Sequence, residues 1–81
     1  MVITKRQFDI LCDRYTLSPT QSEIAGLLLQ GKTTNRELVD AVGKREVAVQ
    51  RHVKRMMDKM FCRNRSDIIL RFWNDSADSD A

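Results

Sequence analysis

The residues with the clearest chemical character form a basic block in the second half of the 81-residue chain. Of the 22 residues from 44 to 65, eight are basic and two are acidic, a local charge of +6, whereas the rest of the chain carries −3. The basic residues of the block are Lys44, Arg45, Arg51, Lys54, Arg55, Lys59, Arg63 and Arg65. Because two acids cannot neutralise eight bases, the block favours a polyanion-binding site over a solvated face of paired charges.

Catalytic and metal-binding chemistry have little support in the sequence. The single histidine, His52, has no serine or cysteine nucleophile at a spacing that suggests a triad, and the chain has no glycine-rich phosphate loop. With Cys12 and Cys62, it offers too few soft ligands at metal spacing for a zinc site. We therefore expect no catalytic residue, no metal and no cofactor, and two reduced, partly buried thiols.

Length and composition predict one small globular domain, with 42% hydrophobic and 31% charged residues arguing against a disordered chain. The longest apolar run, residues 24–29, is far shorter than the ~18 residues of a membrane-spanning helix. The N-terminus also lacks the apolar stretch of a signal peptide. These features predict a cytoplasmic protein without a membrane partner.

Apolar residues recur with helical spacing along the whole chain, and no segment alternates as a strand would. A first amphipathic helix is expected over residues 4–14. Two further helices are expected to begin after Ser18 and Thr34, because a Gln or Glu three residues later completes a capping box in each case. Gly31 and Gly43 are expected to end these two helices.

The basic block coincides with the next expected helix, residues 46–60, whose apolar stripe should face the core. A last short helix is expected over 66–73, capped by Asn64. A short helix, a turn containing Gly43 and a longer basic helix form a helix-turn-helix. The second helix of such a pair fits the DNA major groove, which is ~12 Å wide. The small, acidic residues 74–81 are expected to be disordered.

These segments resemble the LuxR-type (GerE-like) DNA-binding domain of bacterial transcription regulators. The resemblance covers residues 17–70 and rests on Leu17-Ser18-Pro19-x-Gln21-x-Glu23-Ile24, Val49-x-x-His52-Val53-x-x-Met56-x-x-Lys59-Met60 and Arg63-Asn64-Arg65-Ser66-Asp67. It implies an all-α fold, namely a four-helix LuxR/GerE-type helix-turn-helix domain with an additional N-terminal helix. The expected organisation is an N-terminal extension over 1–16, the DNA-binding domain over 17–73 and a tail over 74–81.

The resemblance also implies a function and the residues that carry it. The protein is expected to be a sequence-specific regulator of transcription that binds double-stranded DNA through residues 46–60 and forms a homodimer through its C-terminal helix. The expected base-contacting residues are Gln50, Arg51 and Lys54, together with Val47 on the same outward face. The expected phosphate-contacting residues are Thr34, Asn35, Arg36, Lys44, Arg45, Arg55 and Lys59. The expected dimer interface is Ile69, Phe72 and Trp73.

The start of the expected recognition helix departs from the family pattern. Lys44 replaces an apolar residue, Arg45 replaces a serine or threonine cap, and Val47 and Ala48 replace a lysine and a threonine. Operator sequences of the family should therefore not be transferred to this chain. An alternative function stays open, a protein-interaction module of the same fold that acts as an antagonist or coactivator of another transcription regulator. RNA polymerase and another regulator are accordingly further candidate partners.

Two other polar residues are expected to serve the fold. The resemblance places His52 beside the core, near the backbone of bound DNA. Arg65 is expected to make a structural contact at the turn rather than a base contact. An ion pair with Asp67 or Glu46 is one option for it.

Overall fold

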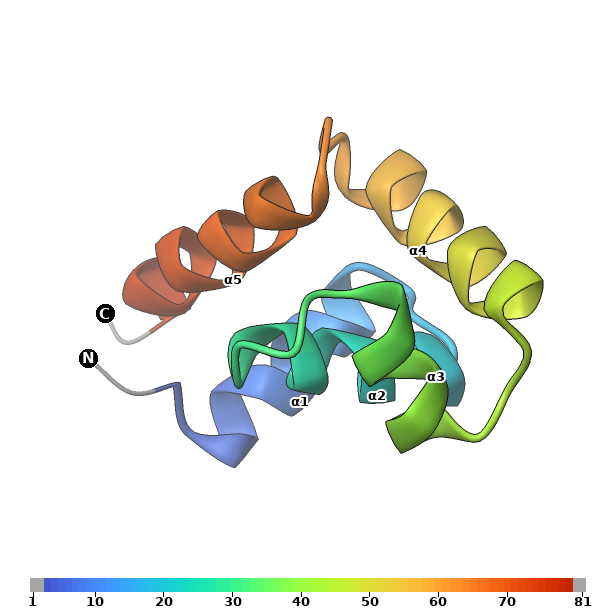
Figure 1. Ribbon diagram of the computed structural model, residues 1–81. Helices are drawn as coiled ribbons and strands as arrows, with labels where there is room; N and C mark the ends of the chain where they lie inside the picture. Colours follow the sequence, from blue (N-terminus) through green and yellow to red (C-terminus); the bar gives the residue numbers. More distant parts are fainter. Residues whose placement is uncertain (1–2, 80–81) are drawn as a thin grey trace.

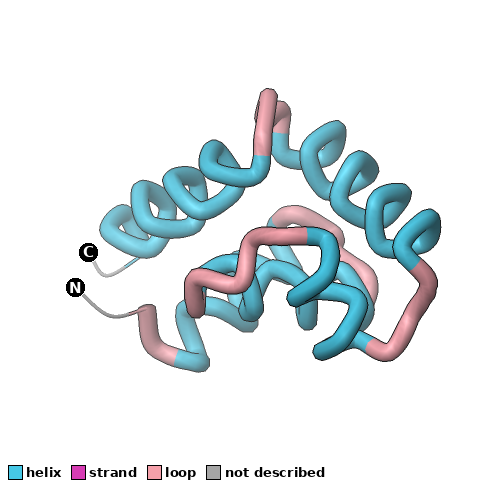
Figure 2. The backbone as a smooth tube through the Cα atoms, viewed as in Figure 1, coloured by secondary structure: helices cyan, strands magenta, loops and turns pink. Residues whose placement is uncertain are grey.

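The computed structural model describes residues 3–79, with side chains described through residue 76, and five helices joined by short loops (Figures 1 and 2). The helices are α1 (Lys5–Arg14), α2 (Pro19–Leu29), α3 (Asn35–Val42), α4 (Glu46–Met60) and α5 (Arg65–Ser79). The described residues include no strand, so the predicted all-α fold is confirmed. Within this part of the chain, no helix is long and apolar enough to cross a membrane.

The ends of the helices follow from local hydrogen bonding. Thr4, Ser18 and Thr34 each accept a hydrogen bond from the backbone three residues later and complete the reciprocal bond of a capping box. Gly43 ends α3 with a φ of 75°, and Gly31 follows α2 with a φ of 93°. Both angles lie in the left-handed region that glycine adopts most easily, which explains why the chain turns at these points.

All five helices contribute to one hydrophobic core. In Figure 1, α4 and α5 slope down on either side of the loop that connects them, and α1, α2 and α3 lie beneath them. The largest fully buried side chains are Leu11, Ile24, Leu28, Leu38, Val49, Met56, Met60, Ile68 and Phe72. Helix α1 is therefore an integral part of the core rather than an appendage of the helix-turn-helix.

Helix α5 is longer than the sequence suggests. The expected helix ends at residue 73, and the expectation that residues 74–81 are disordered is wrong for 74–79, because α5 continues through Ser79. Ser76 is buried, and the Tyr15 hydroxyl donates a hydrogen bond to the Asp75 carboxylate, which also pairs with Arg71 Nε at 3.2 Å. Contacts with α1 thus stabilise a helical end that its polar composition alone does not favour. Residues 80–81 lie outside the described residues.

Phe72 was expected in a dimer interface, and the structure corrects this prediction. Its side chain is fully buried, stacked against Phe8 with ring centroids 5.4 Å apart and edge-on to Tyr15 at 5.3 Å. Because α1 covers this side of α5, Phe72 cannot contact a second molecule unless α1 and α5 separate. Ile69 and Trp73 remain half-exposed on the neighbouring side of α5.

Candidate nucleic-acid interface

Helix α4 has one buried face and one exposed basic face. Val49, Val53, Met56 and Met60 are buried against the other helices, as the apolar stripe predicts. The exposed positions of its first two turns and the beginning of the third include the four expected base-contacting residues, Val47, Gln50, Arg51 and Lys54. The helical repeat places these four side chains on one surface. Val47 is 66% exposed, so none of the described residues covers it.

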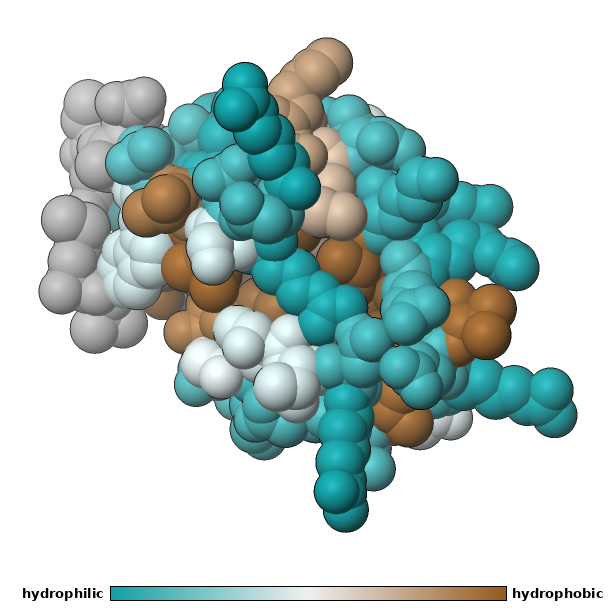
Figure 3. Space-filling view, turned by 45° about the horizontal axis from the view of Figure 1, so that its top comes forward, coloured by the Kyte–Doolittle hydropathy of each residue, from teal (hydrophilic) through white to brown (hydrophobic). Residues whose placement is uncertain are grey.

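The N-terminus of α4 carries two cations, Lys44 and Arg45, beside one carboxylate, Glu46. Arg45 is the N-cap residue and makes no side-chain capping bond, and Lys44 beside it is also exposed. The first backbone N–H groups of a helix have no internal partner and carry the positive end of the helix dipole. Two cations at this end oppose the dipole in the free protein, but they form a suitable site for a phosphate group. Figure 3, which brings α4 and α5 forward, shows long hydrophilic side chains projecting over this side of the molecule.

A chain of side-chain hydrogen bonds connects three helices at this surface. Arg65 at the start of α5 donates to the Thr33 carbonyl at 2.5 Å and to the side-chain oxygen of Asn35. Asn35 Nδ2 donates to Glu46 Oε1 at 3.2 Å, and Gln50 Nε2 donates to the same oxygen at 3.4 Å. The structural role predicted for Arg65 is confirmed, but its partners lie in the loop before α3 and at the start of α3 rather than on a carboxylate. The network orients one expected base-contacting residue, Gln50.

Three of the expected phosphate-contacting residues form side-chain hydrogen bonds within the chain. Asn35 is one of them, because it belongs to the network just described. Lys59 Nζ donates to the Thr16 carbonyl at 2.8 Å and to Gln21 Oε1 at 2.9 Å, which ties the end of α4 to the α1–α2 loop. Thr34 Oγ1 donates to Glu37 Oε1 at 2.8 Å within its capping box. We therefore assign these three side chains to positioning the helices. Four expected phosphate contacts are exposed and, among the described side chains, form no ion pair: Arg36, Lys44, Arg45 and Arg55.

His52 lies on α4 between the buried and exposed faces. Its Nδ1 atom is buried and has no hydrogen-bond partner among the residues that the structure describes. Burial lowers the pKa of His52 from 6.5, and the positive charges of Lys44, Arg55 and Arg51 lower this pKa further. The imidazole is therefore held neutral at pH 7, and a nearby polyanion would favour its protonation.

The comparison with protein families agrees with this geometry. The family model for bacterial regulatory proteins of the luxR family (GerE) matches residues 15–72, which is more than half of the chain. No curated protein and no solved structure matches the chain. The matched residues include α2, α3 and α4 and the first half of α5, so they contain the whole exposed basic surface. The chain therefore belongs to the luxR family of bacterial regulatory proteins, and its helix-turn-helix is a DNA-binding domain of that family.

Proposed function

We propose that the protein is a sequence-specific transcription regulator that places the first half of α4 in the major groove of double-stranded DNA. The observation that carries this proposal is the exposed surface of α4, which presents Gln50, Arg51 and Lys54 together while the opposite face is buried. An arginine guanidinium makes a bidentate hydrogen bond to guanine and a glutamine carboxamide makes one to adenine. Each such pair contributes about 1–3 kcal/mol of discrimination against the wrong base. We accordingly propose that Arg51 and Gln50 read bases, that Lys54 contacts a base or a phosphate, and that Val47 meets the apolar edge of a base.

Four exposed cations that form no ion pair with the described side chains suit contacts with the DNA backbone. These cations come from α3, from the turn and from α4, and they are Arg36, Lys44, Arg45 and Arg55. Contacts with phosphates fix the position of a protein on DNA and release bound counterions. Four such contacts give a log–log slope of affinity against salt of about −3.6 per chain. Such a regulator acts in the bacterial cytoplasm, where its DNA is found.

The proposal includes a homodimer formed through the exposed side of α5. Leu70 is 56% exposed, and Ile69 and Trp73 beside it are half-exposed, which leaves an apolar strip that the described residues do not cover completely. A two-fold arrangement would allow two α4 helices to reach half-sites about 34–36 Å apart. Leu70→Glu should lower the mass measured by sedimentation at micromolar concentration, whereas Ile10→Glu, a matched change on α1, should not. A monomeric wild-type protein would contradict the dimer.

Fluorescence anisotropy with labelled duplex DNA tests the DNA-binding role. Affinity should fall with salt at the slope given above, and Arg51→Ala and Arg45→Ala should weaken binding. Arg14→Ala, which removes an exposed cation on α1, is the matched control and should leave binding unchanged. No binding, or binding that does not respond to salt, would contradict the proposal and favour the protein-interaction alternative, in which the chain binds another regulator.

A further inference from the structure

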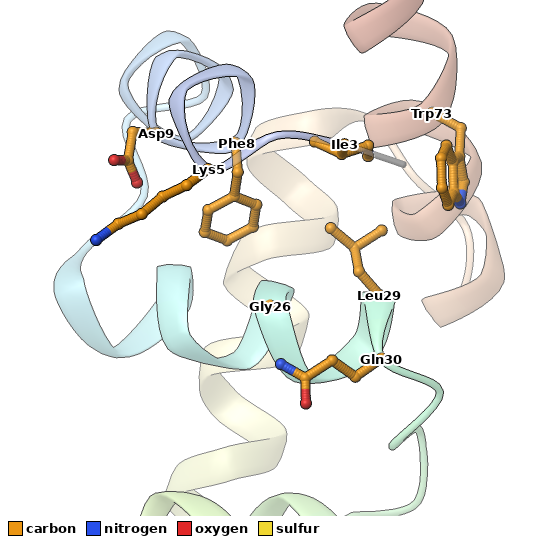
Figure 4. Close-up of a pocket in the computed structure, with 8 residues that line it drawn as sticks. All are labelled: Ile3, Lys5, Phe8, Asp9, Gly26, Leu29, Gln30 and Trp73. Atoms are coloured by element: carbon orange, nitrogen blue, oxygen red, sulfur yellow. The ribbon is translucent and has the colours of Figure 1, made fainter. Parts of the chain in front are cut away.

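A groove of about 650 Å³ lies between α1, α2 and α5, and none of its lining residues comes from the DNA-contacting helices. Figure 4 shows the ring of Phe8 and the side chain of Leu29 pointing into the space between α1 and α2, with the indole of Trp73 on the α5 side. Ile3 completes the apolar lining. Three polar residues lie at its edge: Lys5, Asp9 and Gln30.

Gly26, in the middle of α2, lines the groove, and neither the packing nor the backbone of the free protein requires a glycine there. Glycine in a helix interior is less stable than alanine. The backbone of Gly26 does not have a positive φ, and a Cβ atom added there would meet only Phe8 Cζ, at 3.6 Å, an ordinary van der Waals contact. An alanine would therefore fit. Its absence leaves bare backbone at this point of the groove, which permits close approach by another molecule.

Trp73 is the second unusual feature of the groove. A tryptophan side chain gains most when its rings are buried and its N–H is bonded, yet Trp73 is half-exposed along the groove. It faces the half-buried Phe8 and Leu29 across the groove. Two aromatic side chains, aliphatic carbons and an exposed helix backbone thus surround one concave space.

We propose that this groove binds an uncharged, largely apolar small molecule that contains an aromatic ring. Its volume lies within the range of about 300–1,000 Å³ found for ligand pockets, and its lining of apolar and aromatic side chains with few polar groups is typical of them. Lys5 and Asp9 lie four residues apart on one helix and carry opposite charges, so the edge has no net attraction for a charged ligand. The Gln30 amide can donate or accept one hydrogen bond to orient the molecule.

The size of the groove argues against a protein in the same place. Eight residues line it. A stable protein–protein interface uses about 20–30 residues on each side. A second copy or a partner helix would therefore need much more surface than the groove offers, whereas a small molecule can bury most of its own surface there. This inference does not depend on the proposed DNA contacts, because the residues that carry them lie on other elements. It shares one residue, Trp73, with the proposed dimer strip.

The full chain can be titrated with N-phenyl-1-naphthylamine, an uncharged aromatic probe. Trp73 is the only tryptophan, so energy transfer from it to the probe reports binding to the protein, and the amide chemical shifts locate the probe. We expect saturation at one probe per chain, with amide chemical-shift changes confined to the groove, including Phe8, Gly26 and Leu29. Gly26→Leu, which fills the groove, should weaken binding at least tenfold. Glu23→Leu is the matched control, because it introduces the same side chain on the exposed side of α2, and it should leave the affinity unchanged.

A milder variant protects the test if leucine at position 26 disturbs folding. The added methyl group of Gly26→Ala fits the observed space, so this variant should raise the melting temperature and lower the affinity for the probe severalfold. Binding that does not saturate, shifts spread over the core, or equal affinity in the Gly26→Leu and Gly26→Ala variants and the wild type would overturn the proposal. A loss of dimer mass in Gly26→Leu without any probe binding to the wild type would also overturn it and assign the groove to a second copy. DNA affinity measured in parallel separates these outcomes from failure of the DNA-binding role.

Discussion

Phe61 provides a sharp test of the physical reasoning about this fold. It ends α4 in the left-handed conformation, with φ 57° and ψ 41°, and its side chain is 89% exposed. A residue with a Cβ atom loses about 1–2 kcal/mol in this conformation, whereas glycine adopts it readily. Because the phenyl ring is almost fully exposed, its removal sacrifices very little buried apolar surface. Phe61→Gly should therefore stabilise the protein.

The expected gain is smaller than the whole backbone cost. Glycine also increases the conformational freedom of the unfolded chain, which offsets about 0.4–1 kcal/mol. The net increase in the free energy of unfolding is then about 0.5–1 kcal/mol. For a domain of this size, 1 kcal/mol corresponds to about 4–8 °C in Tm.

Thermal and urea unfolding, followed by circular dichroism, measure this gain. Phe61→Ala is the matched control, because it removes the same ring but keeps a Cβ atom in the left-handed conformation, and it should be close to neutral. DNA affinity should not change in either variant, since Phe61 lies at the opposite end of α4 from Val47. A lower Tm for Phe61→Gly than for wild type would refute the reasoning and mean that the ring makes stabilising contacts.

Three further predictions concern the contacts that hold the helices together. Tyr15→Phe removes the hydrogen bond from α1 to Asp75 and should lower the free energy of unfolding by about 1–3 kcal/mol in urea titrations; an unchanged value would contradict the role of this bond in holding the end of α5. The pKa of His52 is lowered in the folded state, so the unfolded chain binds the proton more readily and the free energy of unfolding should fall as the pH drops below 6.5. His52→Gln should flatten this dependence. Parallel curves of stability against pH for the two proteins would contradict the role of His52. Arg65→Ala should release Asn35 and weaken DNA binding without removing any DNA-contacting side chain, and full affinity in a folded variant would show that the network does not position α4.

The helix boundaries that depend on local chemistry could be predicted from the sequence. Ser18 and Thr34 cap the helices that follow them because the partners in each capping box lie three residues away. Gly43 turns the chain after α3 for an equally local reason. The outward face of α4 followed in the same way from helical spacing, since the apolar stripe containing Val49 and Val53 had to face the core.

Features that depend on distant partners could not be predicted in this way. The end of α5 is helical because Tyr15 bonds to Asp75, 60 residues later, and composition alone gives no indication of this contact. The same packing of α1 on α5 buries Phe72, whereas a helix that is apolar on several sides does not reveal which side a neighbouring helix covers. Lys59 looks like a surface cation until its bond to the Thr16 carbonyl, 43 residues away, is known.

Selection from a random duplex DNA library, with the retained sequences read for wild type and Arg51→Ala, tests the central claim most directly. The account predicts that the wild type enriches a two-fold-symmetric site at near-physiological salt. The Arg51→Ala protein should retain the rest of that site and lose the preference at one position in each half. If the wild type retains no DNA, or if the variant selects the same sequence at every position, the assignment of α4 as the helix that reads DNA is wrong.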